Sequence, residues 1–206
     1  TMIQEAIKWA TGGDTIRVWA GTYTENVVVW KSVNIQGAGP SNTIVVAANT
    51  SQPVFGVSAN YVNLTGFTIT GALNHSAVVL SYANYTRISA NNLVGNEHGI
   101  MLGFSYNSSI SENLISRNTR GGISSLGSSV SVSGNDITGN GDGISLDLSC
   151  NSSISGNNIT GNKIGINLFL SEDNTISGNN VTGNSGVGID VSFSSDNLIY
   201  DNCFSN

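Results

Sequence analysis

The sequence is poor in charged residues and in proline. Charged residues make up 10% of its 206 positions, well under half of the roughly 25% that is usual in soluble domains. Its 7 Lys and Arg and its net charge of −6 cannot form the basic surface that nucleic acid requires, so nucleic-acid binding is excluded. Only 2 prolines are present, and apolar residues recur throughout, which argues against a disordered chain.

Cysteine and long apolar runs are scarce as well. Cys150 and Cys203 lie in different sequence contexts, and two such thiols form neither a disulfide framework nor a zinc site. No apolar run approaches the roughly 18 residues of a membrane span, so none is expected. Small polar residues replace the missing charge, with 28 Asn, 30 Ser, 16 Thr and 25 Gly. This composition indicates an extracellular or cell-surface location.

What the sequence contains instead is a repeat of 22 residues. One apolar column runs through Ile88, Ile110, Val132, Ile154, Ile176 and Leu198, and a second through Leu93, Ile115, Ile137, Ile159, Val181 and Cys203. Two Asn columns keep the same phase: Asn91, Asn113, Asn135, Asn157 and Asn179, closed by Asp201, and Asn96, Asn118, Asn140, Asn162, Asn184 and Asn206. A Gly-Ile-x-Leu segment recurs at 99–102, 143–146 and 165–168, with a variant at 188–191 and its first half at 122–123. Internal periods of this length are typical of solenoid proteins.

The repeat predicts an all-β fold, a single-stranded right-handed parallel β-helix with three strands per coil. Stacked coils place equivalent residues about 4.8 Å apart, the spacing of hydrogen-bonded strands. The Ile columns then face inward, and each Asn amide donates to the amide one coil away, so that a buried Asn ladder satisfies its own hydrogen bonds. We expect these Asn residues at the corners, in unusual backbone conformations.

The chain is expected to form one β-helix domain over residues 1–206. Helical spacing of apolar residues predicts a capping helix within 1–12, followed by irregular first coils over 13–84 and regular repeats over 85–206. Asn206 completes an Asn column at a coil boundary, so the last coil is expected to be open, either for more chain of a longer protein or for a partner.

These segments resemble a known superfamily. Residues 13–26 and 31–37 are similar to the first coils of pectin-lyase-like proteins, and the later Gly-Ile-x-Leu and Asn-x-Ile units resemble the parallel β-helix repeats of the NosD-like family. The resemblance implies the fold over nearly the whole chain, and a kinship with secreted and surface-layer-associated proteins of methanogenic archaea. It does not imply one activity, because the superfamily includes lyases, hydrolases, esterases, epimerases, adhesins and surface proteins.

Candidate catalytic residues follow from the outward positions of the Gly-Ile-x-Leu strands. His98, Asp142 and Asp190 fall at these positions. They are candidates because polysaccharide-cleaving relatives use clustered carboxylates on the outer face of one sheet. Asp142 and Asp147 are separated by about 16 Å of strand, wider than a hydrolase pair, and Lys163 is the one cation expected on that sheet. Scattered solvated polar residues are the alternative that the sequence favours.

The resemblance to NosD also raises a role with copper, whose soft ligands are Cys, Met and His. Cys203 falls in an inward column, Cys150 in a turn, Met101 stands alone, and His75 and His98 have no third ligand in the repeat. We therefore expect no metal and no cofactor.

Eight Asn-x-Ser/Thr sequons are candidate glycosylation sites: Asn49, Asn63, Asn74, Asn84, Asn107, Asn151, Asn158 and Asn180. Asn84, Asn107 and Asn151 are expected on one inter-strand turn, from which a glycan would project clear of the coils.

Two functions from different classes fit these observations. The first is a non-catalytic extracellular structural or adhesive module, which self-associates or binds other surface domains through its open last coil. The alternative is a domain that binds or cleaves carbohydrate.

Overall fold

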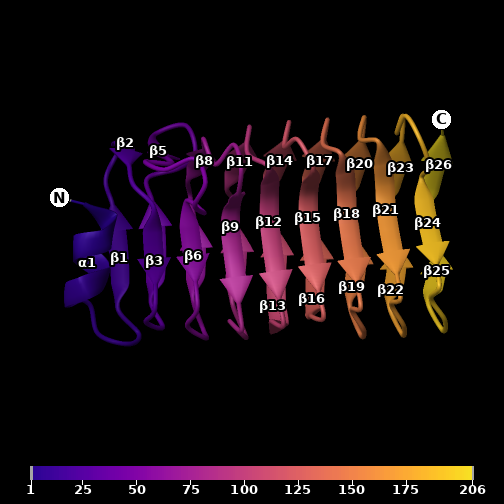
Figure 1. The fold of residues 1–206 in the computed structure, drawn as a ribbon, viewed down its shortest axis with the longest axis horizontal. Helices are drawn as coiled ribbons and strands as arrows, with labels where there is room; N and C mark the ends of the chain where they lie inside the picture. Colours follow the sequence, from indigo (N-terminus) through magenta and orange to yellow (C-terminus); the bar gives the residue numbers. More distant parts are fainter. Residues whose placement is uncertain (1, 206) are drawn as a thin grey trace.

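The computed structural model describes residues 2–205, which form a right-handed parallel β-helix of about nine coils behind one short helix. Helix α1 spans Ile3–Trp9, and 26 strands follow it. The coils stack along one axis, with α1 at one end and the last coil at the other (Figure 1). No helix among these residues is long and apolar enough to cross a bilayer.

Three parallel sheets, here called A, B and C, form the sides of the β-helix. Sheet A contains β1 (Thr15–Val18), β4 (Asn34–Gly37), β7 (Asn63–Thr65), β10 (Arg87–Ser89), β13 (Tyr106–Ser111), β16 (Ser129–Ser133), β19 (Ser153–Ser155), β22 (Thr175–Ser177) and β25 (Leu198–Tyr200). Sheet B contains β2 (Gly21–Thr24), β5 (Thr43–Val46), β8 (Thr68–Thr70), β11 (Asn92–Val94), β14 (Leu114–Ser116), β17 (Asp136–Thr138), β20 (Asn158–Thr160), β23 (Asn180–Thr182) and β26 (Cys203–Ser205). Sheet C contains β3 (Val27–Val29), β6 (Phe55–Val57), β9 (Ser76–Ser81), β12 (His98–Gly103), β15 (Gly121–Leu126), β18 (Asp142–Asp147), β21 (Ile164–Phe169) and β24 (Ile189–Ser192). The chain passes from sheet A to B, from B to C and from C back to A, and we name the three corners by these sheets.

The predicted apolar columns form the core. Ile88 pairs with Ile110 on the next coil, and Leu93 pairs with Ile115. All four side chains are fully buried, because inward positions of stacked coils cover one another. Each coil therefore hides its apolar face only when a further coil or a cap covers it.

The Asn ladders are present as predicted. Asn135 is 1% exposed, and its side-chain carbonyl accepts hydrogen bonds from the backbone and side-chain amides of Asn113, both at 3.0 Å. Its own amide donates to the carbonyl of Ile110 at 2.9 Å and to the side chain of Asn157 at 2.9 Å. One side chain thus ties three successive coils together, which fixes the repeat at 22 residues.

The expectation that these Asn residues adopt unusual backbone conformations was wrong. The residue immediately before each ladder Asn has the positive φ, such as Ala90 at 52° and Gly134 at 64°. That turn lets the following Asn point inward, and a glycine suits it because it has no Cβ.

The 22-residue spacing fails at the last coil. Ile176 pairs with Ile199 rather than Leu198, and Val181 pairs with Phe204 rather than Cys203. The turn before β24, Gly-Asn-Ser-Gly-Val-Gly, is one residue longer than its counterpart before β21. The Asn column is accordingly closed by Asn202, which accepts from Asn179 at 2.8 Å, and not by Asp201. Cys203 is exposed rather than inward, and the place of Asn206 lies outside the described residues.

Helix α1 covers the first coil. Ile3 and Ile7 are buried against the core. The carboxylate of Glu25, itself 4% exposed, accepts from the backbone amides of Ile3 at 2.9 Å and Gln4 at 3.0 Å, so it satisfies amides that a helix start leaves free.

We expect Asn135→Ala to lower the free energy of unfolding by about 3 kcal/mol, because it leaves buried amides and carbonyls on two neighbouring coils without partners. Urea denaturation followed by circular dichroism measures this loss. Asn158→Ala, on an exposed side chain of the next coil, is the control and should change stability by about 0.5 kcal/mol or less. Equal losses in the two variants would contradict the structural role of the ladder.

Candidate functional site

A shallow hollow of about 360 Å³ lies on the outer face of sheet C. Outward residues of β12, β15 and β18 line it, because strands in register bring side chains of successive coils side by side. His98 and Asp142 are both in this set, so two of the three candidate residues meet. Its polar lining is completed by Arg120, Ser124, Ser125, Ser145 and Asp147.

Asp190 does not share the hollow lining. It pairs in the sheet with Asn167, on the far side of β21 from Asp142, and its carboxylate accepts from the hydroxyl of Ser192 at 3.0 Å. Asp147, at the other end of the same strand as Asp142, lines the hollow as well. Of the three candidate residues, the structure brings His98 and Asp142 to the hollow and leaves Asp190 outside its lining.

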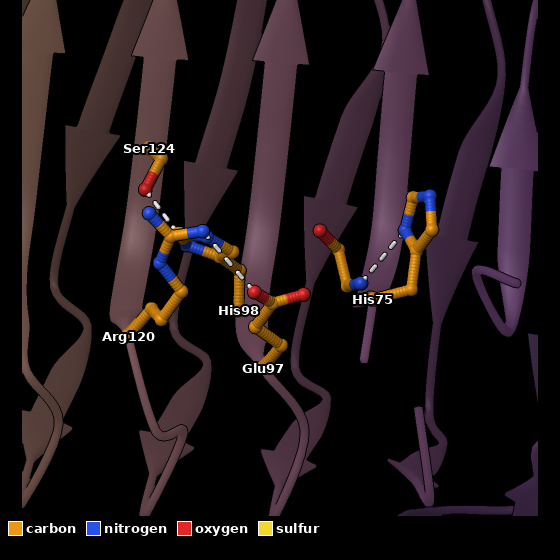
Figure 2. A network of polar contacts seen from close by, with 6 residues as sticks. His75, Glu97, His98, Arg120 and Ser124 are labelled. Carbon is orange, nitrogen blue, oxygen red and sulfur yellow. Dashed lines mark hydrogen bonds and ion pairs between the residues drawn. The ribbon is translucent and has the colours of Figure 1, made fainter. Parts of the chain in front are cut away.

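His98 is held by its neighbours on two coils (Figure 2). Its Nδ1 and the hydroxyl of Ser124 share a hydrogen bond of 3.0 Å. Beside it, Arg120 forms an ion pair with Glu97 at 3.2 Å. Burial lowers the pKa of His98, and the charge of Arg120 lowers it further, against the opposing effect of Glu97. The imidazole is thus favoured in its neutral form.

The pKa values of the two carboxyl groups in the hollow, those of Asp142 and Asp147, are raised. Burial raises the pKa of Asp142, and the like charge of Asp147 adds to the rise while Lys163 opposes it. Burial also raises the pKa of Asp147, against a hydrogen bond from Ser145 at 3.4 Å. A neutral imidazole beside carboxyl groups of raised pKa can exchange protons with a bound hydroxyl, or accept hydrogen bonds from it.

Sequence reasoning missed Arg120 and Ser124. Arg120 directly precedes β15 and was not assigned to the sheet, and it reaches the hollow across one coil. Ser124 stands in the predicted outward column beside Met101, but one serine among 30 gave no signal.

The sequons divide by accessibility. Asn107 and Asn151 are exposed at the C–A corner, both with positive φ. On the coil of Asn84, the position equivalent to Asn107 is occupied by Tyr85, which also has positive φ. Asn84 comes one residue earlier and is half-buried. Its side-chain carbonyl accepts a hydrogen bond from the backbone amide of Tyr106 at 2.8 Å. The sequence suggested that the three Asn residues occupy equivalent positions, but Asn84 stands one residue before the position of the other two. The amide of Asn63 is engaged with Asn34.

The fold is that of a parallel β-helix, and solved structures of this class superpose on it. Pectate lyase Pel9A superposes with a TM-score of 0.79 at 15% identity, over 97% of this chain and 64% of that chain. The A-module of the Azotobacter vinelandii mannuronan C-5 epimerase AlgE4 gives 0.73 at 20% identity, over 97% and 71%. The catalytic unit of an α-1,3-glucanase from Streptomyces thermodiastaticus gives 0.76 at 20% identity, over 94% and 38%. At these identities the likeness concerns the fold alone.

The particular family is shown by the sequence itself. Residues 10–206 match the family described as periplasmic copper-binding protein (NosD), and the chain belongs to that family. No curated protein matches the sequence.

The described residues do not fit a copper site. Within residues 2–205, no three His, Cys, Asp or Glu side chains are grouped to hold a metal ion. Of the soft donors, His98 and Met101 line the hollow, but their neighbours there are carboxylates and hydroxyls, which suit hard ions. Cys150 and Cys203 lie on separate coils, and Nδ1 of His75 accepts from the Ser76 amide at 2.9 Å.

We expect Asp147→Asn to lower the pKa of Asp142, because it removes a like charge from the hollow. Carbon-detected NMR titration of the carboxyl groups measures this change. The folded state binds the Asp142 proton more tightly than the unfolded chain, so stability falls as pH rises from about 4 through the raised pKa and stays lower above it. Asp142→Asn should therefore melt no lower than the parent protein at pH 7, and any advantage should vanish at about pH 3.

Asp190→Asn is the control for the titration, since Asp190 lies outside the hollow lining. An Asp142 pKa that responds equally to both substitutions would contradict the shared hollow.

Proposed function

We propose that the chain is a rigid structural module of an extracytoplasmic protein, and that further β-coils add to its open last coil. The exposure of inward-facing apolar residues on that coil carries this proposal. Val191 is 42% exposed, Ile199 39% and Phe204 54%, whereas Leu168, Ile176 and Val181, their partners one coil earlier, are fully buried.

Strands β24, β25 and β26 also present backbone groups that no further coil pairs with among the described residues. An unpaired edge above an exposed apolar interior is suited to strand addition. The occupant that matches both features is another β-coil, which supplies backbone partners on three sides and an apolar interior of the same shape.

The two ends of the β-helix differ in this respect. Helix α1 covers the first coil and buries Ile3 and Ile7, so that end offers no comparable surface. Two copies that join at their last coils make a closed twofold contact, not a growing fibre. Nine coils at about 4.8 Å each give a rod of about 40 Å, and the joined pair a rod of about 80 Å.

An extracytoplasmic location is supported by the periplasmic description of the family and by the Asn-, Ser- and Gly-rich composition. If the protein is glycosylated, Asn107 and Asn151 are the sequons we expect to be modified first, because both are exposed at a corner and their side chains form no hydrogen bonds within residues 2–205.

The hollow on sheet C supports a second candidate function, the binding of carbohydrate. Carboxylates accept hydrogen bonds from sugar hydroxyls, and the fold neighbours include an α-1,3-glucanase. Asp142 and Asp147 favour a neutral sugar over an anionic one, since the cation at the rim, Arg120, is already paired with Glu97.

We expect the purified chain to form rods of doubled length at high concentration, joined at the last coil. Negative-stain electron microscopy and sedimentation velocity measure this. Phe204→Asp should shift the population to single rods, because it places a charge in the apolar contact, whereas Leu114→Asp, at an exposed leucine on sheet B, should not. Cys203 lies in the last strand and is exposed, so a short bismaleimide should link two copies through it. Single rods at every concentration, without this link, would refute the end-on contact.

For the hollow, we expect a soluble α-1,3-glucan oligosaccharide to bind and Asp142→Ala to weaken binding about tenfold or more, which corresponds to about 1.4 kcal/mol or more. Isothermal titration calorimetry measures the affinity. Asp190→Ala is the matched control, and an alginate oligosaccharide is the anionic comparison. Binding that survives Asp142→Ala, or an undetectable affinity of the parent chain, would refute this second function.

A further inference from the structure

A row of large apolar side chains runs along the C–A corner. Its members are Tyr82, Phe104, Leu148, Leu170 and Phe193, one after each strand of sheet C from β9 to β24 except β15, which Gly127 follows. Backbone hydrogen bonds confirm the row: the amide of Phe104 donates to Leu126, that of Gly127 to Asp147 and that of Leu148 to Phe169, at 2.9–3.0 Å. These side chains are 44–81% exposed. We call this row the apolar ridge.

The ridge stands out against the other two corners, which share its backbone conformation. At the A–B and B–C corners a residue of positive φ recurs once per coil, and most of these residues are glycine. They are Gly66, Ala90, Glu112, Gly134, Gly156, Gly178 and Asp201 at the A–B corner, and Gly71, Gly95, Arg117, Gly139, Gly161 and Gly183 at the B–C corner. At the ridge the φ values are 50–53° for Tyr82, Phe104, Leu148, Leu170 and Phe193. Bulky side chains are unfavourable in this conformation, and stacking between neighbouring coils, such as that of Tyr82 on Phe104, offsets part of that cost.

The ridge and its flanks make a large apolar surface. Leu126 and Phe169 lie on one flank, with Asp147 between them in the sheet, and Tyr85 and Tyr106 on the other, all four between 39% and 50% exposed. Together the nine apolar side chains offer on the order of 900 Å². Monomeric proteins rarely expose more than a few hundred Å² in one patch, and a stable interface needs roughly 800 Å² from each partner.

The stacked rings at this corner are poor platforms for sugars. Tyr82 on the ridge stacks on Phe104 with centroids 5.5 Å apart and an interplanar angle of 16°, and Tyr61 stacks on Tyr85 of the flank at 5.0 Å and 6°. Stacking along the rod covers the faces of these rings, whereas Phe193 meets Phe169 edge to face, at 5.7 Å and 83°. Apolar side chains that recur once per coil match a partner with the same repeat, which a second β-helix has.

From this geometry we infer that two copies of the chain pair side by side and antiparallel along the apolar ridge, with the twofold axis between Gly127 and Leu148. The six ridge positions are then symmetric about the axis. Tyr82 meets Phe193 of the second copy, Phe104 meets Leu170, and Gly127 meets Leu148. A twofold contact of this kind closes on itself.

The position of Gly127 supports this register. The ring of Phe104 leans over Gly127, where a Cβ would lie 2.8 Å from it, and a hollow of about 370 Å³ opens beside them towards Ser129 and Asn151. Leu148 of the second copy would enter this hollow beside the Phe104 ring, and the symmetry axis repeats the insertion on the other side. Interdigitation of this kind is a feature of well-packed interfaces.

Charge favours the antiparallel orientation. The acidic residues of the C–A turns lie on the last coils, at Glu172, Asp173 and Asp196, whereas the turns after Tyr82 and Phe104 carry none. A parallel pair would bring like charges together. In the antiparallel pair Asp196 faces the end that carries exposed Arg87, so the two charges are complementary.

Sedimentation velocity of the full chain tests the pairing. The chain is produced without glycosylation, because a glycan on Asn107 or Asn151 at the same corner would block the contact. Leu148→Asn should raise the dissociation constant of the side-by-side dimer about tenfold or more, and should preserve the fold because Asn tolerates positive φ. Leu114→Asn is the matched control and should leave the constant within about twofold. Phe204→Asp removes the end-on contact, so measurements in that background separate this pairing from the proposed function.

Cross-linking tests the register. Cys150 lies two residues after Leu148 and is exposed, so a short bismaleimide should link two copies through Cys150 in the Phe204→Asp background. In a Cys150→Ser background, a mixture of Tyr82→Cys and Phe193→Cys chains should give the mixed disulfide. Links between two Tyr82→Cys chains instead, a dimer unaffected by Leu148→Asn, or a monomer at every concentration would each overturn the inference.

Discussion

The buried asparagine ladder is the interaction on which the rest of this structure depends. Each ladder side chain accepts from the coil before it and donates to the coil after it, as Asn135 does with Asn113 and Asn157. Buried amides are costly without partners, so a shift of one residue in any coil would break several hydrogen bonds at once. The ladder therefore locks the register of all three sheets, and length variation is confined to the turns between the ladder positions.

The same constraint decides what the sequence could predict. The core columns and both ladders were predictable because a 22-residue period sustains them over several coils. The extra residue before β24 was not recognised, because Leu198 and Ile199 are both apolar and Cys203 and Phe204 both suit an inward position. Asn202, one residue after Asp201, was the signal that the spacing had changed, since a carboxylate cannot donate as the ladder requires.

The candidate site was harder to predict than the core, for a physical reason. Inward residue types repeat because the side chains inside every coil pack against the same kind of neighbour on the next coil. Outward side chains face solvent, so their residue types need not repeat. Whether Asp142 and Asp147 line one hollow depends on the side chains of the neighbouring strands and on the way that Arg120 reaches across from the preceding turn. Spacing along one strand places the two carboxyl groups, but it does not show which side chains of the neighbouring coils complete a hollow around them.

The three corners show where the rigid framework leaves freedom. The A–B and B–C corners take positive φ once per coil and the C–A corner up to twice, and glycine meets this need with no steric cost. The A–B and B–C corners use it at most positions, whereas the C–A corner holds Tyr82, Phe104, Leu148, Leu170 and Phe193. Each of these residues costs about 1 kcal/mol in that conformation and exposes apolar surface as well. A framework that is stabilised by its ladders and its Ile columns can carry this cost. The local strain at the C–A corner is thus offset by the buried interior of the same coils and by aromatic stacking between them, such as that of Tyr82 on Phe104.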